Sequence, residues 1–367
     1  VARHTGEVTY VSPASKSILG YDPSELIGYE WWNKTLTDPA ERERLKRYAR
    51  DVALRNIGQD HRQYERCFVT PQGMRKWILW EAVPGPGKSA ISIGHDITRR
   101  KLAELDLDRR NEQLRETNAA LIDSLNYAQK IQDVLLPDPS QLNSHLTDSF
   151  VFYRPRDIVS GDFYFFRNKE DVLYVAGADC TGHGVPGAMM SVLGTSLLRD
   201  AIREFPTAEP DEILRLLDTE LIMAMTRESG EGLKDGMDIA LVKYDPQSRS
   251  VSFSGAYRSL LLVRDGNLRE IAGSRYPIGH FEGEKFFSNV RLDVQSGDRL
   301  YMFSDGVTDQ FGGEHDKKFN RKRLKELILG VQEMPMREQG DFVEYAMNNW
   351  MQTNEQTDDM LLIGMEI

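Results

Sequence analysis

The sequence has few cysteines, no long apolar run and no excess of positive charge. The 2 cysteines among its 367 residues, Cys67 and Cys180, lie far apart, which excludes a disulfide framework and a cysteine-rich zinc site. A reducing, cytoplasmic compartment is therefore expected. No apolar run approaches the roughly 18 residues that cross a bilayer, so the sequence predicts no membrane span. The net charge of −11 argues against a nucleic-acid binder, because phosphate contacts require clustered Lys and Arg.

The length and the distribution of charge predict more than one domain. At about 100 to 200 residues per domain, the chain should form two or three domains. Residues 1–98 hold 14 basic and 12 acidic residues, whereas residues 141–367 hold 25 basic and 37 acidic residues. The acidity therefore belongs to the C-terminal part of the chain.

Four short motifs stand in order in the first hundred residues. They are Gly6–Ala14, Leu19–Asp22 with Glu25–Gly28, Gln72–Trp77 and Asp96–Thr98. Together they resemble a PAS sensory domain, which implies an antiparallel sheet with helices over residues 1–98. The residue pattern itself predicts strands at Val8–Val11 and Lys76–Trp80 around a helix at Pro39–Asn56. PAS domains usually begin before the first of these motifs, so we expect the chain to be a fragment of a longer protein.

Residues 99–139 are rich in charged residues and Leu and contain almost no Gly or Pro. Seven residues follow a spacing of four and three: Leu107, Asn111, Leu114, Asn118, Leu121, Leu125 and Ala128. Asn at heptad position a and Leu at position d predict a parallel two-stranded coiled coil, and hence a homodimer. The alternative is a single solvated helix that packs on its own domain. After Ala128 the register shortens, because the next apolar residues are Ile131 and Leu135, and two prolines then end the helix.

Residues 140–367 alternate predicted strands and amphipathic helices. The expected strands are Phe150–Arg154, Asp162–Arg167, Val172–Ala178, Asp238–Tyr244, Val251–Ser254, Leu260–Val263, Arg299–Phe303 and Met360–Ile367. The expected helices are Pro186–Glu204, Pro210–Arg227, Lys322–Leu329 and Asp341–Met351. Many strands with helices inserted in two pairs favour a layered α/β sandwich.

Aspartates recur at the ends of these strands, each beside small or turn-forming residues. They are Asp162, Asp179, Asp305, Asp358 and Asp359. Taken singly, each is more simply interpreted as a helix cap or a turn. Taken together, carboxylates that converge cannot all stay ionised without a cation, and oxygen ligands select Mg²⁺ or Mn²⁺ over zinc. Two such ions can activate a water for in-line displacement at phosphorus.

The order of these motifs resembles the metal-dependent protein phosphatase superfamily, in the bacterial branch typified by the stage II sporulation protein E phosphatase and stress-response phosphatases. The matching segments are Pro155–Phe163, Asp179–Gly187, Gly236–Ala240, Phe303–Gly306 with Asp309–Gly313, and the helical lead-in Ala128–Pro137. The resemblance implies a four-layer α/β/β/α sandwich over residues 140–367. It also implies a serine/threonine phosphatase with two divalent cations, Mn²⁺ or Mg²⁺.

The same resemblance assigns the ligands of the two cations. They are Asp162, Asp179, the backbone carbonyl of Cys180, Asp305, Asp358 and Asp359. Asp179 would bridge the two ions, Asp162 would bind nearby, and Asp358 and Asp359 could share one role. The aspartates Asp162, Asp179, Asp305 and Asp358 are accordingly the expected catalytic residues.

Three further side chains near these aspartates suit phosphate chemistry. His183 is a candidate general acid for the leaving oxygen, and the alternative is a turn histidine packed by the following helix. Arg154 and Arg156 are candidates for holding the substrate phosphate, and the alternative is an exposed arginine at a strand end. Cys180 lacks the phosphate loop of a cysteine phosphatase. Neither haem nor flavin is supported by the sequence.

These expectations combine into a signal-regulated phosphoprotein phosphatase. A signal at the sensor would pass along the coiled coil into the catalytic domain. The expected signalling residues are Asp96, Thr98, Asn111, Asn118, Ile131 and Leu135. By resemblance, the substrate would be a phosphorylated anti-sigma-factor antagonist. The alternative is a non-catalytic PAS-dimer scaffold whose phosphatase domain binds a partner without turnover.

Overall fold

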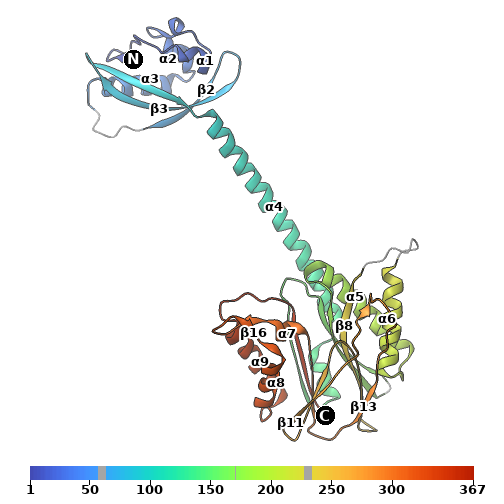
Figure 1. The fold of residues 1–367 in the computed structure, drawn as a ribbon. Helices are drawn as coiled ribbons and strands as arrows, with labels where there is room; N and C mark the ends of the chain where they lie inside the picture. Colours follow the sequence, from blue (N-terminus) through green and yellow to red (C-terminus); the bar gives the residue numbers. More distant parts are fainter. Residues whose placement is uncertain (57–62, 170, 227–233) are drawn as a thin grey trace. The chain divides into compact units, whose positions relative to one another are not determined.

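Figure 1 shows the computed structural model of the chain, which describes residues 1–56, 63–169, 171–226 and 234–367. The contacts divide the chain into two compact units, Val1–Ala119 and Ala120–Ile367, and each is described by itself. Within the described residues, no helix combines the length and the apolar character that a membrane crossing requires.

The first unit is built on a four-stranded antiparallel sheet with short helices. The strand order is β1 (Ala2–Arg3), β4 (Ser89–Asp96), β3 (Arg75–Gly85) and β2 (Tyr64–Val69). The helices are α1 (Ala14–Ile18), η1 (Pro23–Leu26), α2 (Glu30–Thr35) and α3 (Pro39–Ala53). The predicted helix Pro39–Asn56 corresponds to α3, and the predicted strand Lys76–Trp80 lies within β3. The predicted strand Val8–Val11 is wrong: Val8 alone forms isolated bridges, because α1 follows within a few residues.

Helix α4 (Thr98–Leu135) begins directly after β4 of the first unit and ends in the second unit. Thr98 N donates a hydrogen bond to Asp96 Oδ1 at 2.9 Å, and Trp77 N donates to Thr98 Oγ1 at 2.9 Å. These two bonds fix the first turn of α4 on strand β3. Further along, the side chains at the predicted d positions are more than half exposed: Leu107 58%, Leu114 59% and Leu121 56%. The helix therefore carries an apolar stripe that the described residues of the chain do not cover.

Two antiparallel sheets form the centre of the second unit. One has the order β13 (Val290–Asp293), β9 (Ser250–Ala256), β8 (Gly236–Asp245), β7 (Val172–Cys180) and β6 (Asp162–Lys169), with β12 (Ile278–Gly279) paired to β8. The other has the order β11 (Asn267–Ile271), β10 (Leu260–Arg264), β14 (Arg299–Phe303), β17 (Met360–Glu366) and β5 (Asp148–Arg154). Each predicted strand has a counterpart here. The sequence did not predict β11 and β13, which lie at the edges of the two sheets.

Helices cover both outer faces of the paired sheets. They are α5 (Gly184–Glu204), α6 (Pro210–Met225), α8 (Asn320–Gly330) and α9 (Met336–Met351), with the short η2 (Pro139–Ser144) and α7 (Asp305–Asp309) and a small ribbon of β15 (Phe311–Gly312) and β16 (Lys317–Lys318). All four predicted helices are present; Arg227, the last predicted residue of α6, lies outside the described residues. Figure 1 shows α5 and α6 against one sheet and α8 and α9 against the other.

Side-chain alternation along the strands creates the layers. On β17, Leu361 and Ile363 pack between the two sheets, while Met360 and Leu362 face the core under α8 and α9. A third apolar core joins the other sheet to α5 and α6. The second unit is therefore an α/β/β/α sandwich, as the sequence predicts.

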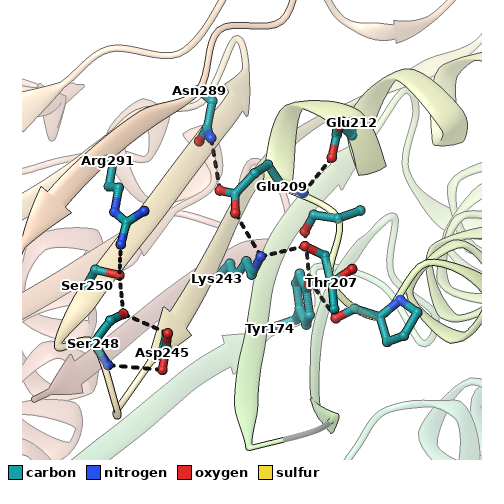
Figure 2. A network of polar contacts seen from close by, with 12 residues as sticks. Tyr174, Thr207, Glu209, Glu212, Lys243, Asp245, Ser248, Ser250, Asn289 and Arg291 are labelled. Atoms are coloured by element: carbon teal, nitrogen blue, oxygen red, sulfur yellow. Dashed lines mark hydrogen bonds and ion pairs between the residues drawn. The ribbon is translucent and has the colours of Figure 1, made fainter.

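A polar network joins the start of α6 to the neighbouring sheet (Figure 2). Lys243 Nζ, on β8, donates to Glu209 Oε1 at 2.8 Å, and Asn289 Nδ2 donates to Glu209 Oε2 at 3.0 Å. Burial raises the pKa of the Glu209 carboxyl, but hydrogen bonds from Lys243, Ser252 and Asn289 outweigh burial and lower it below its ordinary value. The ionised carboxylate therefore stabilises this side of the fold.

We expect Glu209→Gln to reduce the free energy of unfolding by about 0.5–1 kcal/mol at pH 7, because it removes the charge that Lys243 pairs with. A lowered carboxyl pKa stabilises the fold above the ordinary pKa of Glu and loses that effect as the pH falls through the folded-state value. The difference from wild type should therefore vanish in acid. Urea titrations at pH 7 and at about pH 2, below the lowered pKa, measure it, with Glu220→Gln, exposed on α6, as the control. An equal difference at both pH values would contradict the assignment.

Candidate active site

The pairing of three central strands brings three aspartates to one end of a sheet. Asp162 begins β6 and lies opposite Asp179 of β7, and Asp179 lies opposite Asp238 of β8. Residues directly opposite each other on antiparallel strands project from the same face. The strand register therefore places these three carboxyl groups side by side.

The second sheet supplies aspartates to the same site. Asp305 begins α7 directly after β14, and Asp358 and Asp359 precede β17, the strand paired with β14. Gly306 makes this junction possible, because a Cβ at this position would overlap the carbonyl oxygen of Asp359. The sequence motif Asp305-Gly306 thus reflects a close approach between two chain segments.

A buried arginine lies among these carboxylates. Arg258 Nη2 contacts Asp179 Oδ2 and lies 3.1 Å from Asp305 Oδ2 and 3.3 Å from Asp238 Oδ2. Its side chain is only 7% exposed. Sequence reasoning missed both Arg258 and Asp238 as site residues. Asp238 shared the strand-end signal of the other aspartates, whereas the only signal for Arg258 was an arginine between two apolar strands.

Burial and mutual repulsion raise the pKa of most of these carboxyl groups. Burial raises the pKa of Asp179 to about 8 and that of Asp238 to about 6, although Arg258 opposes both changes. Burial first, and then the charge of Asp179, raises the pKa of Asp162 well above its ordinary value. Burial also raises the pKa of Asp305, but the charge of Arg258, together with hydrogen bonds to Asp179 and Arg258, lowers it below its ordinary value. One guanidinium therefore does not balance the negative charge of the cluster.

The aspartate carboxylates are oxygen donors of the type that binds a divalent cation. Asp162 is 2% exposed, and its Oδ2 has no hydrogen-bond partner among the described residues. A buried carboxylate oxygen without a partner is costly unless a cation or a proton balances it. In the described parts of the chain, however, no three His, Cys, Asp or Glu side chains are arranged to hold a metal ion as they stand. The guanidinium of Arg258 lies among the carboxylates instead.

The two adjacent aspartates before β17 have different surroundings. Asp359 is 3% exposed; its Oδ1 accepts from Arg156 N and its Oδ2 from Gly161 N, both at 2.7 Å. Asp359 therefore fixes the loop that leads into Asp162, and its share in the ligand role of Asp358 stays a prediction. Asp358 is less buried, and burial, with the charges of its acidic neighbours, raises its pKa.

The predicted general acid and the two predicted phosphate-binding arginines differ in their position relative to the aspartates. His183 Nδ1 is 3.2 Å from Asp157 Oδ2, its side chain is half exposed, and its charge acts on Asp358, so it lies at the rim of the site. Arg154 Nη1 donates to Asn348 Oδ1 on α9 at 2.6 Å, which directs it to the outer helical layer and not to the aspartates. The expected phosphate contact by Arg154 therefore has no support from its position here and stays a prediction. Arg156 is exposed, beside the segment that Asp359 holds.

Cys180 is a core residue with its backbone at the site. Its side chain is 4% exposed in the core beneath α5 and α6, and burial raises the pKa of its thiol well above the ordinary value. A buried, protonated thiol is a poor nucleophile. Its carbonyl oxygen lies against the Gly161 backbone, where an added Cβ would be 3.3 Å away. Only the carbonyl is thus placed near the aspartates.

The end of α4 is tied to the loop before Asp162 by a residue that sequence reasoning missed. Gln132 is 5% exposed; its Nε2 donates to Ser160 O at 2.6 Å and to Ser191 Oγ at 2.7 Å, and Ser160 N donates to its Oε1 at 3.1 Å. The sequence predicted Ile131 and Leu135 at this point. Ile131 is 48% exposed and Leu135 is half-buried, so the helix turns Gln132 toward the site loop.

Comparisons with known proteins agree on one family. The family model described as Stage II sporulation protein E (SpoIIE) matches residues 169–367. The solved SiaA-PP2C domain of Pseudomonas aeruginosa is 31% identical, covers 68% of this chain and 98% of its own, and gives a TM-score of 0.62. The PP2C phosphatase domain and regulatory-domain fragment of SpoIIE from Bacillus subtilis is 18% identical, with coverage of 60% and 63% and a TM-score of 0.49. No curated protein matches the chain.

We expect Asp162→Asn to raise Tm in EDTA by about 2–4 °C, because a neutral amide removes the repulsion between Asp162 and Asp179. In Mn²⁺ the wild type should regain the advantage, since only the state that binds the ion is stabilised. Thermal unfolding in both buffers measures the change. As a matched control, Asp298→Asn should lower Tm in both, because Asp298 is the buried partner of Arg264. A lower Tm for Asp162→Asn in EDTA would contradict the prediction.

Proposed function

Because the chain belongs to the stage II sporulation protein E family of serine/threonine protein phosphatases, which are hydrolases, we propose that it removes phosphate from phosphoserine or phosphothreonine in a protein at its aspartate cluster. The observation that carries this proposal is the gathering of Asp162, Asp179 and Asp305 at one end of two sheets, where a buried oxygen of Asp162 has no partner among the residues that the structure describes. Such a set is suited to divalent cations, and Mn²⁺ or Mg²⁺ are the ions we propose.

The proposed ligands are Asp162, Asp179, Asp305, Asp358 and the carbonyl of Cys180. When bound, the two divalent cations supply an activated water and neutralise charge on the phosphoryl oxygens. Asp359 holds the backbone before Asp162 through its contacts to Arg156 N and Gly161 N. Its role is to keep the position of Asp162 fixed, which matters because small displacements of catalytic groups reduce rates strongly.

His183 and Arg156 are the proposed substrate-facing groups at the rim. Asp157 holds one ring nitrogen of His183, which leaves the second nitrogen for proton transfer to the departing serine or threonine oxygen. Arg156 is exposed and next to the segment that Asp359 holds, so its guanidinium can reach a phosphate that enters from solvent.

Regulation by a sensor is the second part of the proposal. Residues 1–98 form a PAS sensor, residues 99–139 a parallel coiled coil that makes a homodimer, and residues 140–367 the phosphatase domain. The exposed leucine stripe on α4 supports the coiled coil, and Asn111 and Asn118 lie exposed between its leucines. Asp96 and Thr98 join the sensor sheet to the helix.

The bonds from Gln132 to Ser160 support a route from this helix into the site. Ser160 Oγ accepts from Asp162 N at 3.0 Å, so a movement of α4 that displaces Gln132 also displaces the backbone of Asp162. Ile131 and Leu135 remain proposed signalling residues on the same turns. For the substrate we propose a phosphorylated anti-sigma-factor antagonist, on the resemblance to the family alone.

The second candidate function is a non-catalytic scaffold. It is favoured by one observation, namely that a guanidinium lies among the carboxylates and no three of the described side chains form a ready metal site. The retention of every expected aspartate favours catalysis.

We expect Asp179→Asn and Asp305→Asn each to reduce Mn²⁺-dependent hydrolysis of a phosphoserine peptide by at least about 100-fold, because each removes a proposed ligand. Asp309→Asn is the matched control: it lies on α7 with Asp305 but pairs with Lys318 at the surface, 2.7 Å away. Rates of phosphate release with and without Mn²⁺ measure the effect. No metal-dependent rate in any condition would leave the scaffold as the better account.

We expect one residue inserted after Leu121 to change the phosphatase rate by about fivefold or more, and seven inserted residues to change it little. One residue rotates the upstream helix by about 100°, whereas a heptad nearly restores its phase. In a Gln132→Leu background the single insertion should lose its effect, because the bonds to Ser160 are gone. Steady-state rates of the six proteins measure this, and equal rates for both insertions in the wild-type background would refute the coupling.

A further inference from the structure

The arginine in the carboxylate cluster has an unusual set of partners. One nitrogen of Arg258, Nη2, forms ion pairs with the carboxylates of Asp179, Asp238 and Asp305 at the same time. Its Nε is buried and has no hydrogen-bond partner in the described parts of the chain. A guanidinium normally pairs through its planar fork with a single carboxylate. Arg258 is therefore positioned by its charge at the centre of the cluster and not by a matched pair.

The backbone around Arg258 is built to place it there. Tyr257 has a φ of 57°, a left-handed conformation that is rare for a bulky residue, and its N donates to Ser274 O at 2.8 Å. The carbonyl oxygen of Arg258 packs against Gly255 and Gly273, and a Cβ on either glycine would overlap it. A strained residue and two glycines thus fix the arginine between β9 and β10.

A second arginine, on β10, shows what an ordinary structural ion pair looks like in this protein. Arg264, at the far end of β10, donates from Nε to Asp298 Oδ1 at 2.8 Å and from Nη2 to Asp298 Oδ2 at 2.5 Å. In this pair each carboxylate oxygen of Asp298 accepts from one nitrogen of the guanidinium, and Nη2 also donates to the backbone oxygen of Asp293 at 2.8 Å. The Arg258 cluster has at least three carboxylates for one guanidinium, which leaves an excess of negative charge.

The contacts of Arg258 also determine what it excludes. It contacts Oδ2 of Asp179 and Oδ2 of Asp305. Both carboxylates are proposed metal ligands, one from each sheet. A guanidinium and a divalent cation cannot both hold these oxygens as their nearest positive charge, because two cations in contact repel each other. Binding of either one therefore weakens binding of the other.

We propose that Arg258 is an internal counter-cation that competes with the divalent metal for Asp179 and Asp305 and so sets the metal affinity of the site. This inference rests on the proposed metal-dependent function. The metal-free protein keeps its carboxylates together through Arg258, and metal binding displaces the guanidinium from them. The affinity for metal is then lower than that of the same carboxylates without the arginine, and a change that pulls Arg258 away raises it.

The test is Mn²⁺ binding to the full chain, measured by the electron paramagnetic resonance of free Mn²⁺. Arg258→Gln should lower the Kd for Mn²⁺ by about tenfold, because the competitor is removed and the carboxylates remain. Arg258→Lys should lower the Kd less, because the lysine ammonium keeps a positive charge near the carboxylates. In EDTA the Tm of Arg258→Gln should fall, and saturating Mn²⁺ should raise its Tm by more than it raises that of the wild type. Arg264→Gln is the matched control and should lower Tm with no change in Kd.

An unchanged or higher Kd in both Arg258 variants would overturn the inference and would identify the arginine as a partner of the metal site. Arg258→Lys keeps the experiment decisive if Arg258→Gln fails to fold in EDTA. Failure of the proposed function would look different: the wild type would bind no Mn²⁺, and Asp179→Asn would leave the binding isotherm unchanged.

Discussion

Repulsion among buried carboxylates is the constraint on which the rest of the second unit depends. Two sheets end at the same place, and the strand register fixes Asp162, Asp179 and Asp238 next to one another on one of them. The other sheet adds Asp305 directly after β14. Burial raises the pKa of Asp162, Asp179 and Asp238, which means that the folded protein destabilises their ionised forms. A fold that keeps such a cluster needs positive charge close by, and Arg258 supplies only part of it.

The same region also explains how a polar residue on a long helix can matter to a distant site. Gln132 is buried on α4, and its amide satisfies both the N–H and the carbonyl of Ser160. A buried amide that satisfies a backbone in this way is strongly fixed in position, because a small shift leaves three polar groups unpaired. Apolar side chains such as Ile131 tolerate sliding contacts. The polar link is therefore the more position-sensitive part of the helix.

The sequence predicted the central strands of the second unit and the aspartates at their ends other than Asp238, but neither the edge strands β11 and β13 nor the partners of the aspartates. The apolar composition of Arg299–Phe303 and Met360–Glu366 predicts two strands, and the position of Asp305 and Asp358 at strand ends indicates site residues. No such pattern indicates Arg258, because its place in the site depends on which strand ends meet in space. Gln132 lies where the apolar register shortens, and its role could not be predicted there, because periodicity scores only hydrophobicity and does not detect a polar partner 28 residues away.

The carboxylates of the site differ in what holds them, and Asp359 differs in this respect from Asp179 and Asp305. Both oxygens of Asp359 accept from backbone N–H groups, which are part of the chain and cannot leave while the loop is folded. Asp179 and Asp305 are balanced by a side chain, which can rotate away. Carboxylates held by the backbone therefore serve as permanent structure, whereas carboxylates held by a side chain can change their cation. This division would give the proposed metal-dependent reaction a rigid frame around a centre whose cation can exchange.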